Sequence, residues 1–145
     1  MMRPSMTATR QHIQSLERYA AQSGARLIRG DLPDSVHGQV VEGLITLSAR
    51  LSPEQELLAL VHELTHWLAH RSESGCEHAA APSRTVYEYE AEAVEALVMA
   101  RLGVTLADAV PGEDAAPTDD LLSSSVTRVI STSRRICQAL GLEMD

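Results

Sequence analysis

The chain has 145 residues, of which 44% are hydrophobic, and its formal net charge is −8. This composition is ordinary for a globular protein, and the length suits one domain with its own core. The negative charge disfavours direct binding to nucleic-acid phosphates, and no apolar run approaches the ~20 residues that span a bilayer. We therefore expect residues 1–145 to form a single domain, with residues 1–9 flexible.

The two cysteines, Cys76 and Cys137, are too few for the disulfide framework of a secreted domain. The N-terminal segment also lacks the apolar stretch of a secretory signal. These features predict a cytoplasmic protein with free thiols and no membrane association. They do not indicate the oligomeric state.

The first half of the chain predicts one helix followed by short strands. Apolar residues recur at helical spacing in residues 11–22, and Gly24 follows as a C-terminal stop. Residues 25–29 can form a strand, and residues 31–38 are rich in turn formers. Residues 39–48 predict one or two strands around Gly43, most clearly at residues 44–47.

The second half predicts three helices. Ser52, Pro53 and Gln55 form a strong helix start, with a cap, a first-turn proline and a capping box, and this helix should reach about residue 70. Residues 71–84 and 110–120 have the composition of loops. Further helices are expected at residues 86–102, where Gly103 ends the helix, and at residues 121–140. The order predicts an α+β fold with a small sheet before the helix at 52–70.

The most informative motif is His62-Glu63-Leu64-Thr65-His66. Residues four apart on a helix lie one above the other, so both imidazoles can reach one metal ion. Zinc accepts histidine nitrogen, and Glu63 stands where it can take a proton from zinc-bound water. The motif predicts one zinc ion per chain, with His62 and His66 as ligands and Glu63 as the catalytic base.

A third ligand is expected from the next helix, where Glu88 and Glu92 share one face. One of these carboxylates could bind zinc while the other supports a ligating histidine. Glu90 and Glu95 have the pattern of solvated helix charges. His70 should diverge from His62 by about 80° on an α-helix, so we expect it at the surface near the helix end.

The run HELTHWLAH followed by EYEAEAVEALV resembles the ImmA/IrrE-type metallopeptidases and the metallopeptidase half of ArdC-type antirestriction proteins. The resemblance covers about residues 44–102. It implies a zincin-like (gluzincin) domain with a small sheet packed on the HExxH helix. It also implies that His62, His66 and Glu88 bind zinc, that Glu63 is the catalytic base and that Glu92 is a supporting carboxylate.

Two functions follow as expectations. The first is a zinc metallopeptidase-like hydrolase, in which water activated by Glu63 attacks a peptide bond, with a protein or peptide substrate such as a regulatory partner. The alternative is a non-catalytic, zinc-containing regulatory or antirestriction-type protein of a mobile element. A metal-free helical domain would require the whole motif to be coincidental.

Two features of the substrate site are also expected. The strand at residues 44–48 could pair with an extended substrate. Tyr87, Tyr89 and His78 are candidates for stabilising an oxyanion, and the sequence does not choose among them. Cys76 and His78 fit ordinary loop residues.

Overall fold

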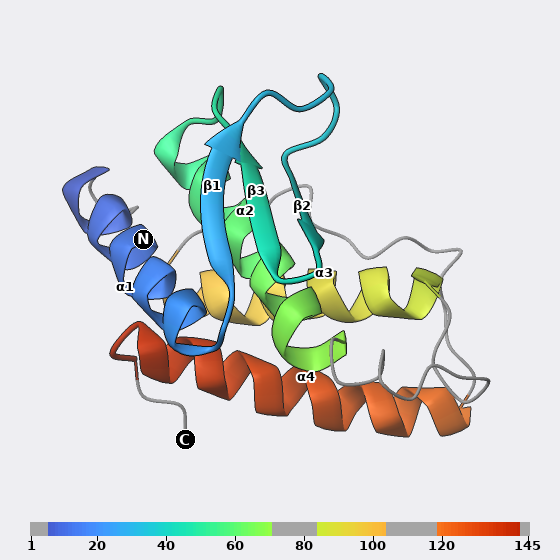
Figure 1. The fold of residues 1–145 in the computed structure, drawn as a ribbon. Helices are drawn as coiled ribbons and strands as arrows, with labels where there is room; N and C mark the ends of the chain where they lie inside the picture. The colour runs from blue at the N-terminus through green and yellow to red at the C-terminus, as the bar shows by residue number, and fades with distance from the viewer. Residues whose placement is uncertain (1–5, 71–83, 104–118, 143–145) are drawn as a thin grey trace.

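A three-stranded sheet comes directly before the helix that carries the HExxH motif (Figure 1). The structure is a computed structural model, and it describes residues 6–70, 84–103 and 119–142. Most of the two expected loops, together with Cys76 and His78, lies outside these ranges. No helix among the described residues has the length and apolar character needed to cross a bilayer.

The sheet has the strand order β1-β3-β2. β1 (Arg26–Gly30) pairs in parallel with β3 (Leu44–Ser48), and β2 (Gly38–Val41) pairs antiparallel with β3. Glu42 and Gly43 connect β2 to β3 with φ values of 48° and 84°. Two successive positive φ values are typical of a type I′ hairpin turn, which explains why the predicted strand segment divides at Gly43.

The central strand is β3, because both of its edges are occupied. The expectation that residues 44–48 pair with substrate is therefore wrong. A central strand has no free backbone groups to offer, and among the described residues β1 and β2 are the two strands with an open edge.

The motif helix begins where the sequence predicts. α2 (Pro53–Thr65) is capped by Ser52, whose hydroxyl accepts from the Gln55 backbone N–H at 3.2 Å. The Gln55 side chain accepts from the Ser52 N–H at 3.0 Å, which completes the capping box. α2 then passes into a π-helical turn, η1 (His66–His70).

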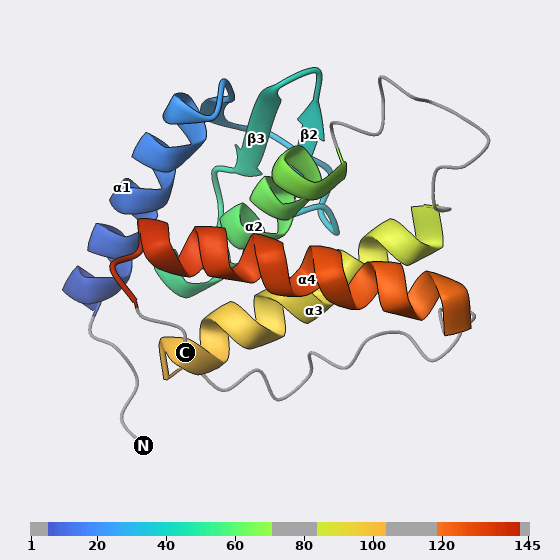
Figure 2. The ribbon, with the colours of Figure 1, turned by 90° about the horizontal axis from the view of Figure 1, so that it is seen from below.

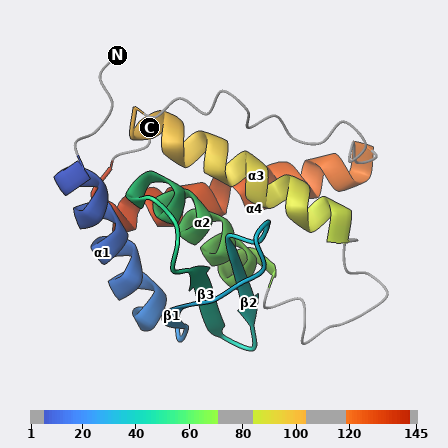
Figure 3. The ribbon, with the colours of Figure 1, turned by 90° about the horizontal axis from the view of Figure 1, so that it is seen from above.

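Three more helices surround α2. α1 (Met6–Gln22) packs along one side of it, so residues 6–9, expected to be flexible, are helical. α3 (Arg84–Arg101) and α4 (Asp119–Ala139) lie side by side and start at the same end of the molecule (Figures 1 and 2). Figure 3 shows α2 between the sheet and this helix pair. The predicted α+β fold is confirmed.

The core is built without phenylalanine, from leucine, isoleucine, valine and alanine side chains of α1, β3, α2, α3 and α4. Trp67 is half-buried at its edge, where its indole N–H donates to the Ser23 carbonyl at 3.1 Å. Cys137 is a buried free thiol on α4, and burial raises the pKa of this thiol. α2 therefore has the apolar core on one face and the two histidines beside it.

Candidate metal centre

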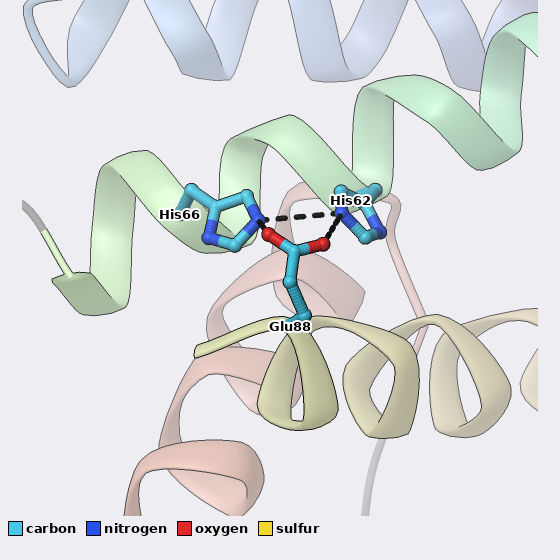
Figure 4. Close-up of side chains that lie close together, drawn as sticks. All are labelled: His62, His66 and Glu88. Atoms are coloured by element: carbon cyan, nitrogen blue, oxygen red, sulfur yellow. Dashed lines mark hydrogen bonds and ion pairs between the residues drawn. The ribbon is translucent and has the colours of Figure 1, made fainter. Parts of the chain in front are cut away.

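Glu88 of α3 lies between His62 of α2 and His66 of η1 (Figure 4). Its carboxylate oxygens lie 3.0 Å from His62 Nε2 and 2.9 Å from His66 Nε2, and the two Nε2 atoms are 3.2 Å apart. The donor atoms of the three residues lie within 4.8 Å of one another. The structure thus brings together the three ligands predicted from the motif and the resemblance.

This donor set suits zinc. Two imidazoles and one carboxylate are the protein ligands of a catalytic zinc site, where a fourth position stays open for water or substrate. Zinc–ligand bonds of about 2.0–2.1 Å place neighbouring ligands of a tetrahedron ~3.3 Å apart. The 3.2 Å between the two Nε2 atoms is close to that value, and each Nε2 atom lies 2.9–3.0 Å from one of the two Glu88 oxygens.

The charges at the site also favour a cation. Hydrogen bonds with His62 and His66 hold the pKa of the Glu88 carboxyl well below its usual range. Burial lowers the pKa of His62, but hydrogen bonds with Glu88 and Glu95 outweigh burial and raise it to about 10. The surroundings therefore stabilise positive charge at the point where the Nε2 atoms meet.

Glu63, the predicted base, is 7% exposed and faces the same cavity as the two histidines. Burial raises the pKa of its carboxyl, and the nearby His62 and His66 oppose that shift. β2 passes close to it, because a Cβ built on Gly38 would lie 3.0 Å from Glu63 Cγ. A buried carboxylate with a raised pKa is suited to taking up a proton.

Glu95 is the carboxylate that supports His62. Its Oε1 forms a short hydrogen bond with His62 Nδ1, which leaves Nε2 facing Glu88. Glu92, which the resemblance implies for a supporting role, lines the cavity, whereas the carboxylate that bonds His62 Nδ1 is that of Glu95. Glu95 is only 8% exposed, so its expected role as a solvated charge is wrong.

His70 is buried rather than at the surface, with 8% of the residue exposed. Its Nδ1 lies 2.8 Å from His66 Nδ1, and its Nε2 lies 2.9 Å from Glu90 Oε1. Glu90 is itself 1% exposed and accepts hydrogen bonds from Ser125 and Arg128 of α4. The expectations of a surface histidine and a solvated Glu90 are both wrong.

The protonation states of His70 and Glu90 follow from their burial and their hydrogen bonds. Burial lowers the pKa of His70, which favours its neutral form. Burial raises the pKa of Glu90, but hydrogen bonds from His70, Arg128 and Ser125 outweigh burial and lower it to about 2. Glu90 is therefore an ionised carboxylate inside the protein.

The π-helical turn explains the position of His70. An α-helix advances past a full turn in four residues, which is why His70 was expected to diverge from the site. A π-helical turn holds more residues, so four residues fall short of a full turn. His70 consequently turns back beneath His66 and toward α3.

The metal centre opens into a cavity of about 760 Å³. One wall is formed by β2 and the residues before it, from Ser35 to Val40, and α2 and α3 form the other walls. Of the three oxyanion candidates, Tyr87 lines the cavity, Tyr89 does not, and His78 lies outside the described residues. The Tyr87 ring also stacks on His70, with ring centroids 4.1 Å apart.

Sequence reasoning missed the groups that support the ligands. Glu95 lies seven residues after Glu88, which places both on one helix face, so this spacing could have indicated it. No comparable spacing links Glu90 to Ser125 and Arg128, because the contact joins two helices far apart in the sequence.

Comparison with known proteins places the chain in a family. No curated protein and no solved structure matches it. The family profile of the IrrE N-terminal-like domain, Peptidase M78, matches residues 20–107, which is more than half of the chain and includes both motif histidines and Glu88. The chain therefore belongs to the IrrE N-terminal-like family of metallopeptidase-related proteins.

Proposed function

We propose that this protein is a zinc-dependent peptidase with a zincin-like active site. The observation that carries the proposal is the convergence of His62, His66 and Glu88 beside the buried carboxylate of Glu63, at the wall of one cavity. His62, His66 and Glu88 would hold one zinc ion. A purely structural site would need these ligands but no buried base facing them.

The chain supplies the proton transfers. When bound, zinc would polarise the scissile carbonyl and lower the pKa of a coordinated water. The Glu63 carboxylate would take a proton from the attacking water and deliver it to the leaving amine. Its raised pKa supports this exchange, because the group must hold the proton between the two steps.

The substrate is proposed to be an extended peptide that adds to the open edge of β2. This strand lines the cavity, and Gly38 brings its backbone against Glu63. A peptide paired with β2 would therefore run past the base and the metal ligands. A cavity wall formed by a strand suits an extended, unfolded segment of a regulatory partner protein.

The substitution Glu63→Gln tests this proposal. It removes the base while all three ligands remain, so one zinc per chain should persist while cleavage falls by roughly 10²–10⁴-fold. Zinc-loaded protein would be incubated with a mixture of extended peptides, and cleavage products identified by mass spectrometry. Glu42→Gln, on the exposed β2–β3 turn, is the matched control and should cleave like wild type.

Two results would oppose the proposal. Equal cleavage by wild type and Glu63→Gln would remove Glu63 from the mechanism. Zinc binding without cleavage of any peptide by the wild type would favour the alternative, a non-catalytic regulatory protein that contains zinc.

A further inference from the structure

We infer that His70 and Glu90 are positioning residues, which fix the proton of His66 on Nδ1 and so leave its Nε2 free to bind metal. The inference rests on the proposed metal site and concerns groups outside the ligand set. The chain of contacts runs from His66 through His70 and Glu90 to Arg128 on α4.

The contacts are continuous and short. His66 and His70 face each other through their Nδ1 atoms at 2.8 Å, and the opposite nitrogen of His70 lies 2.9 Å from Glu90 Oε1. Arg128 approaches the same carboxylate from α4, with Nε 2.9 Å from Oε1 and Nη2 2.7 Å from Oε2. The four residues thus join η1, α3 and α4 into one network.

When a cation held by His62, His66 and Glu88 occupies the point that His66 Nε2 faces, only one arrangement of protons satisfies this network with neutral imidazoles. Without the ion, the Glu88 carboxylate 2.9 Å from His66 Nε2 would require a proton on that nitrogen. The ionised Glu90 carboxylate accepts hydrogen bonds only, so His70 must donate from Nε2. A neutral imidazole has one donor and one acceptor, so His70 Nδ1 must accept. His66 must then donate from Nδ1, and its lone pair lies on Nε2, the atom that faces Glu88 and His62.

Hydrogen bonds hold the Glu90 carboxylate in place, so it can fix which nitrogen of His70 carries the proton. Besides His70 and Arg128, it accepts from the Ser125 hydroxyl, so both of its oxygens have partners. The Tyr87 ring stacked on His70 restricts the imidazole from the other side. Metal ligands are commonly oriented by such partners, and loss of one typically weakens metal affinity 10–100-fold.

The two motif histidines therefore have unequal support. Glu95 bonds His62 Nδ1 directly, whereas Glu90 acts on His66 through an intervening imidazole. Because the second path ends on α4, we expect the packing of α4 to affect metal affinity although none of the three candidate ligands lies on α4.

The pair His70→Leu and His70→Gln tests the inference. Leucine fills similar space but neither donates nor accepts, whereas glutamine can accept from His66 and donate to Glu90. We expect zinc affinity, measured by competition with a chelating dye, to fall 10–100-fold in His70→Leu and to recover largely in His70→Gln. His12→Leu on α1, which does not line the cavity, should bind zinc like wild type.

The outcomes separate this inference from the proposed function. Wild-type zinc affinity in a folded His70→Leu protein would overturn the positioning role of His70 and Glu90 without contradicting the metal site. Equal loss in the leucine and glutamine variants would also overturn it, because a role in packing alone does not distinguish donors from acceptors. Absence of zinc binding in the wild type would reject the site itself.

A measurement on the wild type covers the case in which His70→Leu fails to fold. Nitrogen NMR of the zinc-loaded protein should find His70 protonated on Nε2, and a scalar coupling between the two Nδ1 nitrogens across their hydrogen bond. A proton on His70 Nδ1 would contradict the inference, because His70 could then not accept a hydrogen bond from His66 at that atom.

Discussion

Gly38 is the residue at which the backbone of β2 comes closest to the proposed base. A Cβ at this position would lie 3.0 Å from Glu63 Cγ, 3.1 Å from Leu47 Cδ2 and 3.3 Å from the Thr46 carbonyl oxygen. These contacts are tighter than normal van der Waals packing, so an alanine would force β2 or Glu63 to move.

We predict that Gly38→Ala destabilises the protein by about 1–3 kcal/mol and lowers peptide cleavage by displacing Glu63. Urea unfolding and the cleavage assay measure the two effects. Gly30→Ala is the matched control, because its nearest neighbour would be Thr46 Cγ2 at an ordinary 3.7 Å. Unchanged stability and cleavage in Gly38→Ala would show that β2 does not constrain the base.

At this scale the three residues that meet at the candidate metal centre were predictable from the sequence, and the groups that contact them from behind were not. His62 and His66 follow from i,i+4 spacing, and Glu88 from the resemblance of the next helix. His70 and Glu90 are charged or polar residues whose burial depends on partners from another helix. Sequence patterns assign such residues to the surface, because polar side chains are usually exposed.

At the scale of elements, the buried contact between Glu90 and Arg128 fastens α3 to α4. The pKa of Glu90 is about 2 in the folded protein and 4.5 ordinarily. A folded pKa below the unfolded one contributes stability above about pH 4.5, and this contribution disappears as the pH falls toward 2. Each pKa unit corresponds to ~1.36 kcal/mol, so the contribution is on the order of 3 kcal/mol.

Glu90→Gln should therefore destabilise the metal-free protein by about 3 kcal/mol near neutral pH, and by progressively less below pH 4.5. Urea unfolding of wild type and variant at several pH values in the presence of a chelator measures the difference. Glu17→Gln, which removes an exposed ion pair with Arg29, should cost less than about 1 kcal/mol. A Glu90→Gln deficit that is constant between pH 7 and pH 3 would contradict the linkage.

The predicted elements agree with the structure where local chemistry sets their ends. The Ser52 capping box begins α2, and Gly24 and Gly103 follow the ends of α1 and α3 with φ values of 90° and 79°. No local sequence pattern indicated the π-helical turn, in which His70 meets Glu90 of α3. The place of β3 in the middle of the sheet depends likewise on long-range pairing with β1.

At the scale of the whole molecule, metal binding should add to stability. The candidate ligands come from α2, η1 and α3, and the groups behind them reach α4, so zinc would join elements that separate on unfolding. Zinc at 1,000 times its dissociation constant contributes about 4 kcal/mol, which corresponds to roughly 8–16 °C in a domain of this size.

Calorimetry with and without chelator checks this prediction. Removal of the ion should lower the unfolding midpoint of the wild type by that amount and leave the midpoint of Glu88→Ala almost unchanged. A chelator effect of equal size in both proteins would mean that the stabilising ion is bound elsewhere.

The most direct test of the metal centre is the zinc content of the purified protein, measured by elemental mass spectrometry. The wild type should carry one zinc per chain, His66→Ala and Glu88→Ala should carry none, and Glu92→Ala should retain it. Zinc retained by Glu88→Ala and lost from Glu92→Ala would move the third ligand to Glu92. A folded wild type that takes up no zinc, even when zinc is supplied, would contradict the metal centre and the peptidase function derived from it.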